Sequence, residues 1–137
     1  ADLPGKGDLV AFDAEFVSVQ EEEAILTDTG NKITIREMRH ALARVSLMDC
    51  ISGNLIIDDY VLPREPIVDY LTRFSGIVAS DLDPKTSPHH LVSTRTAYLK
   101  LRCLMERGCI FLGHGVGKDF LTVNLYVPPN QVIDTVI

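Results

Sequence analysis

The sequence predicts an α/β fold with a mixed five-stranded sheet flanked by helices. In the first half, three apolar segments are joined by turn signals, as in an antiparallel meander of strands. In the second half, apolar residues at helical spacing alternate with short strand-like runs, so we expect parallel strands there. The 137 residues, of which 46% are hydrophobic, suffice for one core, and we expect a single domain over residues 1–137.

Charge and cysteine content restrict the function. The net charge of −6 excludes the strongly basic surface of a simple nucleic-acid binder, but not a nuclease that meets phosphate through metal ions held by carboxylates. The three cysteines have no C-x-x-C spacing, which argues against a disulfide framework and a zinc ribbon and favours a reducing compartment. Because we find no membrane-length apolar run and no signal-peptide pattern, we expect neither a membrane partner nor secretion.

The first strand is predicted over residues 8–19, in the interior of the sheet. Side chains two apart share a strand face, so Asp13 and Glu15 point to one side of this strand. Its other side is apolar and consists of Phe12, Ala14 and Phe16.

Two further strands, residues 41–48 and 55–61, flank a Ser-Gly-Asn turn that is typical of a β-hairpin. Shorter apolar pieces at residues 24–26 and 33–35 surround another turn signal and are expected as strand or loop. Together with the first strand, the hairpin predicts the antiparallel meander.

Helical spacing begins at residues 66–74, where a first helix is predicted to stop at Gly76. A longer helix should begin at Ser87 and Pro88, which have the pattern of an N-cap and a first-turn proline. It should end at Gly108, and its apolar stripe includes Leu91, Tyr98, Leu101 and Met105.

The last part of the chain predicts a strand at residues 109–112, a glycine-rich turn at 113–117 and a helix over 118–125. Residues 131–137 predict one more strand.

Asp13 and Glu15 interrupt an otherwise apolar strand, where charge is costly without a partner. A strand holds two carboxylates at a fixed separation, and Mg²⁺ and Mn²⁺ prefer oxygen ligands. A third acid, Asp119, follows the glycine-rich turn, where backbone and substrate can approach closely. An Asp-x-Glu pair can also be a solvated face, so the pair alone does not establish a metal site.

Two motifs carry a resemblance to a known family. The segment FDAEFV at residues 12–17 resembles the first motif of the RNase T-like DEDD exonucleases, and GHGVGKDF at residues 113–120 resembles the second. The finer match is to the exonuclease domains of the catalytic subunits of PAN poly(A)-nuclease deadenylase complexes. It rests on residues 21–24, 96–102 and 131–136, while residues 56–61, 68–72 and 74–77 are similar to the corresponding stretch of eukaryotic family members.

The resemblance implies an RNase H-like fold and a metal-dependent 3′-to-5′ exoribonuclease that shortens poly(A) tails and releases AMP. It implies two divalent cations, Mg²⁺ or Mn²⁺, held by four acids that act with a histidine. Asp13, Glu15 and Asp119 match the first three acids and are expected to be catalytic and metal-binding. The fourth acid and the histidine lie beyond the segment that matches residues 132–137, so we expect the fold to be C-terminally incomplete and this fragment to degrade RNA poorly.

The family's substrate position implies that the 3′-terminal nucleotide is bordered by four residues: Ala14, Phe16, Val17 and His114. For Phe16, the strand alternation favours core packing as the alternative. His114 belongs to the Gly-His turn and is not the family's histidine. Other polar residues are expected to be structural or exposed, namely Asp58, Asp59, Asp134, Lys85, Lys100, Lys118, His89 and His90, whereas Cys103 and Cys109 should be small buried hydrophobes.

The resemblance also implies partners: the 3′ end of poly(A) RNA, a pseudokinase regulatory subunit and poly(A)-binding protein. It implies a cytoplasmic protein that can gather in processing bodies. Two alternatives stay open, namely an inactive nuclease-like RNA-binding or scaffolding module and a DEDD exonuclease that acts on DNA or on structured RNA ends. DNA-proofreading members follow the first acid pair with a threonine-rich run, from which residues 16–18 depart.

Overall fold

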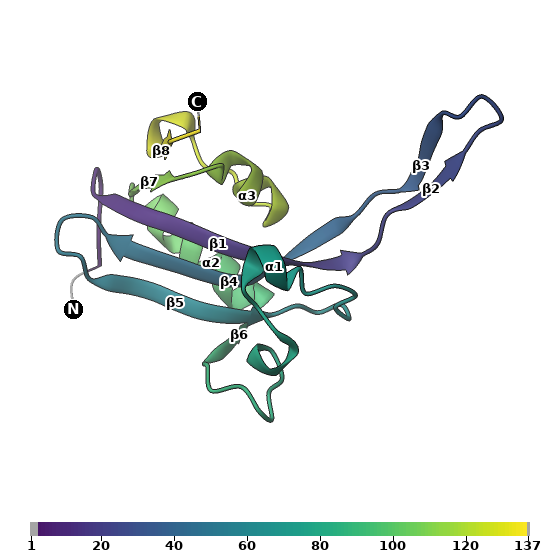
Figure 1. Cartoon of the computed structure of the whole chain (residues 1–137). Coiled ribbons are helices and arrows are strands. Elements are labelled where there is room, and N and C mark those ends of the chain that lie inside the picture. Colours follow the sequence, from purple (N-terminus) through teal and green to yellow (C-terminus); the bar gives the residue numbers. More distant parts are fainter. Residues whose placement is uncertain (1–2, 137) are drawn as a thin grey trace.

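The computed structural model describes residues 3–136 and contains a six-stranded mixed sheet with the strand order β6-β5-β4-β1-β7-β8 (Figure 1). β1 pairs antiparallel with β4 and parallel with β7, so the predicted mixed sheet with an interior first strand is confirmed. The strands of this sheet are β1 (Leu9–Gln20), β4 (Arg39–Asp49), β5 (Leu55–Leu62), β6 (Leu91–Ser93), β7 (Ile110–Gly113) and β8 (Val132–Asp134).

The sheet has six strands rather than five because residues 91–93 continue it as β6. We expected a long helix to begin at Ser87, but Leu91 pairs with Tyr60 in a parallel ladder with β5. The helix α2 (Thr94–Glu106) begins only after Ser93, whose side chain accepts the N–H of Thr96. The N-cap is therefore a serine six residues later than the one that the Ser-Pro pattern indicated.

The helix predicted over residues 66–74 is reduced to α1 (Thr72–Ser75). Upstream of α1, the chain lies against β1, where the N–H of Ser18 donates to Asp69 O at 2.8 Å and Ser18 O accepts from Val68 N at 2.9 Å. Leu71, at φ 51°, then turns the chain sharply into α1. Pairing with β1 has overridden the helical spacing of this segment.

The main core lies between the sheet and the helices α2 and α3 (Val116–Thr122) (Figure 1). Phe12 from β1 and Phe120 from α3 pack with their ring centroids 5.0 Å apart. Cys109 is fully buried as expected, whereas Cys103 on α2 is exposed and corrects that expectation.

The strands β2 (Glu23–Leu26) and β3 (Lys32–Arg36) form a separate two-stranded arm that projects from the ends of β1 and β4 (Figure 1). Two short 3₁₀ helices, η1 (Ala79–Asp81) and η2 (Pro129–Gln131), complete the secondary structure of the described chain. Among the helices within residues 3–136, none combines the length and the apolar character needed to cross a bilayer.

Candidate active site

Asp13 and Glu15 lie on the face of β1 opposite the main core, as the alternation predicted. Asp13 is exposed and Glu15 is half-buried. Burial raises the pKa of Glu15, and the neighbouring carboxylate of Asp13 raises it further. Arg44 stands directly opposite Glu15 on β4 and lowers that pKa, but its charge does not cancel the other two effects.

Asp119 reaches the same place from the first turn of α3. Burial raises the pKa of Asp119 to about 6, with further increases from the charges of Asp13 and Asp134 and an opposing effect of Lys118. Asp119 also contributes to the raised pKa of Glu15. The structure therefore brings Asp13, Glu15 and Asp119 into one electrostatically coupled cluster.

The close approach of α3 to β1 depends on Gly113. A Cβ atom at this position would lie 2.5 Å from Val116 Cγ1 and 2.8 Å from the backbone oxygen of Phe12. Only a glycine lets the chain leave β7 along this path, which brings the first turn of α3 beside β1. The turn is then fixed by Asp134, whose Oδ1 accepts the N–H of Gly115 at 2.9 Å.

The donor set suits a hard divalent cation. Carboxylate oxygens are the ligands that Mg²⁺ and Mn²⁺ prefer, and carboxyl groups with raised pKa values lack sufficient positive charge around them. Within residues 3–136, no three His, Cys, Asp or Glu side chains lie close enough together to form a complete metal-ligand group. A cation bound here would have Asp13, Glu15 and Asp119 as only part of its coordination shell.

A groove of about 220 Å³, the catalytic groove, runs between β1, α1 and α3. Glu15 and Asp119 line it together with Phe16 and Phe74. The Phe74 side chain is 80% exposed, which is unusual for so large an apolar group and leaves its ring available to a base. Sequence reasoning missed Phe74, because the helical spacing of residues 66–74 gives no sign that this side chain is exposed.

The other predicted substrate residues divide into two groups. Phe16 lines the groove and also packs against the main core, so its core packing is confirmed, whereas its contact with the substrate stays a prediction. Ala14, half-buried, lies on the core side of β1. Val17 is fully buried in a second core cluster, and His114 points its Nδ1 toward Thr135 Oγ1 at 3.2 Å. The structure does not place Val17 or His114 in the lining of the groove.

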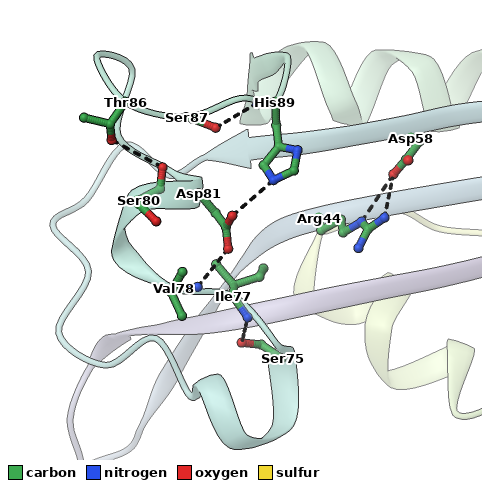
Figure 2. A network of polar contacts seen from close by, with 10 residues as sticks. All are labelled: Arg44, Asp58, Ser75, Ile77, Val78, Ser80, Asp81, Thr86, Ser87 and His89. Carbon is green, nitrogen blue, oxygen red and sulfur yellow. Dashed lines mark hydrogen bonds and ion pairs between the residues drawn. The ribbon is translucent and has the colours of Figure 1, made fainter.

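Arg44 is held firmly in place beside Glu15. Figure 2 shows its guanidinium turned to Asp58, with Nε and Nη2 each 3.2 Å from Oδ1. The same guanidinium lies 4.9 Å from the centroid of the Tyr60 ring. Asp58 is therefore structural, as expected.

His89 is half-buried rather than exposed, which corrects the expectation for it. Its ring stacks on Tyr60 with centroids 3.7 Å apart, and its Nε2 lies 3.1 Å from Asp81 Oδ1 (Figure 2). Lys100 is likewise engaged, because its ammonium donates to the buried Asp59 at 2.6 Å.

Residues 10–137 match the family model of the RNase T exonucleases. The chain is 52% identical over 139 residues to the PAN2-PAN3 deadenylation complex catalytic subunit PAN2 of Cryptococcus neoformans. It is 54% identical over 136 residues to the corresponding subunit of Chaetomium thermophilum. The matches cover 99% and 97% of this chain but 12% of each relative, so the chain spans about an eighth of their length.

Solved structures agree. The catalytic unit of Neurospora crassa Pan2, with protease and nuclease domains, matches with a TM-score of 0.79 at 43% identity, over 98% of this chain and 20% of that chain. The pseudoubiquitin hydrolase-RNA exonuclease module of Saccharomyces cerevisiae Pan2, in complex with AAUUAA RNA, matches with a TM-score of 0.81 at 43% identity, over 98% and 22%. The predicted RNase H-like architecture is confirmed by these matches.

Proposed function

Because the chain belongs to the RNase T exonuclease family, whose DEDD members depend on divalent cations, we propose that it is the nuclease part of a poly(A) deadenylase. Such an enzyme shortens mRNA tails from the 3′ end and releases AMP. The observation that carries the proposal is the convergence of Asp13, Glu15 and Asp119 beside a groove that also presents an exposed aromatic ring.

Asp13, Glu15 and Asp119 would hold Mg²⁺ or Mn²⁺, two ions by the family pattern. Bound cations supply an activated water and neutralise charge on the phosphate and on the leaving 3′ oxygen. The raised pKa values of Glu15 and Asp119 fit this role, since a cation lowers the cost of keeping both carboxyls ionised.

Phe74 would position the substrate rather than take part in the chemistry. Its exposed ring offers a stacking surface for a base at the 3′ end, and Phe16 borders the groove from β1. Lys118 also lines the groove, next to Asp119, where its ammonium can meet a phosphate oxygen.

The names of the relatives support the substrate and the partner. Relatives are catalytic subunits of a PAN2-PAN3 deadenylation complex, and one solved relative is in complex with A7 RNA. We therefore extend the proposal to a PAN3-type regulatory subunit, to poly(A)-binding protein and to a cytoplasmic location.

The direct test uses the full-length protein that contains this domain. Incubated with Mg²⁺ and 5′-labelled RNA that ends in oligo(A), it should release AMP and shorten the tail one nucleotide at a time. A 3′-phosphorylated copy of the same RNA should resist attack. Internal cleavage, or equal decay of both substrates, would contradict a 3′ exonuclease.

A further inference from the structure

The catalytic groove continues beyond His40 and Thr122. These two residues also line a second hollow, of about 170 Å³, which reaches Arg64 in the loop after β5 and Thr94 at the start of α2. Because the same side chains border both spaces, the hollows are adjacent. The second hollow therefore offers an open path away from the carboxylates.

The charge changes along this path. In the catalytic groove, the carboxylates of Glu15 and Asp119 outnumber the ammonium of Lys118. The charged side chains that line the second hollow are Arg64 and Glu65. A second arginine nearby, Arg39, is neutralised by its ion pair with Glu65. Arg64 is exposed, and within residues 3–136 no ion pair or side-chain hydrogen bond engages its guanidinium.

Arg44, which also lies near the carboxylates, is unsuited to binding an RNA phosphate. Arg44 already donates its Nε and Nη2 to Asp58 (Figure 2). Its strand neighbour Glu15, and Asp13 two residues before Glu15, lie on the same face of the sheet as Arg44. A phosphate there would meet carboxylates on two sides. An RNA strand that passes His40, in contrast, would lead away from the acidic cluster and toward the free guanidinium of Arg64.

On these grounds, and resting on the proposed function, we propose that the second hollow binds the sugar-phosphate backbone of nucleotides upstream of the scissile bond. Arg64 is the residue that holds a phosphate there. A guanidinium can donate two parallel N–H groups to one phosphate, and its positive charge binds the phosphate without a bridging metal ion. The cation site then binds the 3′-terminal phosphodiester, while Arg64 binds a phosphate of the RNA upstream of that bond.

The test compares substrates of different length on the full-length protein. Steady-state kcat and KM are measured for oligoadenylates from short to long, with wild type, Arg64→Ala and Arg102→Ala. Arg102 is a matched control, since it is exposed, pairs with Glu106 and lies toward the opposite end of α2 from Thr94. The salt dependence of KM is recorded for the long substrate.

Arg64→Ala should raise KM for long oligoadenylates about tenfold, with kcat unchanged, as expected for one lost charged contact. It should leave KM for the shortest substrate unchanged, and this result also shows that the variant is folded. The slope of log KM against log salt should fall by about 0.7, the value of one single-strand phosphate contact. Arg102→Ala should match wild type.

Equal KM values and equal salt slopes for Arg64→Ala and wild type on the long substrate would overturn the inference. A loss on short and long substrates alike would also overturn it, because Arg64 would then support the fold or the catalytic groove. If the wild type itself does not shorten oligo(A), the proposed function fails rather than this inference.

Discussion

The carboxylate of Asp13 on β1 acts through its charge on Asp119, which lies on α3 and lines the catalytic groove. Burial first, and the carboxylate of Asp13 second, raise the pKa of Asp119 to about 6. The two carboxyls are therefore close enough for the charge of one to affect the protonation of the other. Repulsion between them is a cost that a bound cation removes.

The Asp119 pKa predicts how pH acts on the metal-free protein. Since this pKa is above the ordinary 3.8, the folded state holds an extra proton between these values. The resulting stability is present at low pH and is lost as pH rises through about 6. In EDTA, the Tm of Asp119→Asn minus that of wild type should increase between about pH 4 and about pH 7, the range over which Asp119 titrates. A constant difference would show that Asp119 titrates normally.

Asp13→Asn should separate catalysis from folding. The variant loses a cation ligand, so AMP release should fall by on the order of 10²–10³ or more. Without metal, its Tm should rise by about 1–3 °C, because one repulsive charge is gone. Thermal melts with and without Mg²⁺, run beside an RNA decay assay, measure both effects. Near wild-type decay would mean that Asp13 does not hold the cation.

A side chain should not be tolerated at Gly113, whereas a methyl group should be tolerated at Gly117. Gly113→Ala places a Cβ against Val116 and the Phe12 backbone, so α3 and Asp119 must shift. We expect lower Tm and a large loss of kcat. Gly117→Ala is the matched control, because nothing lies within 4 Å of its added Cβ and the residue is inside a helix. Equal Tm and kcat values for the two variants would show that the close approach at Gly113 does not position Asp119.

Phe74→Ala should weaken substrate binding without affecting the fold. A stacked base contributes about 1–3 kcal/mol, which corresponds to a KM increase of roughly 5- to 150-fold. Phe74→Tyr keeps the ring and should retain most of the affinity. Since the side chain is 80% exposed, the Tm of both variants should stay close to that of wild type. An unchanged KM in Phe74→Ala would remove this residue from the substrate site.

Much of the site could be predicted because its signals are local. Two carboxylates on one face of β1 follow from strand alternation alone, and a glycine-rich turn before Asp119 marks the close approach. Both features are confirmed by the structure.

The predictions that were wrong concern segments whose structure depends on contacts with distant parts of the chain. Val68 and Asp69 lie in a segment with helical spacing but form hydrogen bonds with Ser18. Leu91 pairs with Tyr60. No local pattern specifies either pairing. The exposure of Phe74 follows from the same rearrangement, since a four-residue α1 has no buried stripe to contain it. Tertiary pairing overrode local propensity at each of these places.

The central claim is that Asp13, Glu15 and Asp119 hold the cations that cleave the 3′-terminal bond. Its most direct measurement is AMP release from oligo(A) against Mg²⁺ concentration, for the full-length wild type and for Asp119→Asn. Wild-type activity should rise from a metal-free baseline and saturate, whereas the variant should remain near that baseline across the titration. Wild-type turnover in EDTA, or equal Mg²⁺ curves for the two proteins, would contradict the claim.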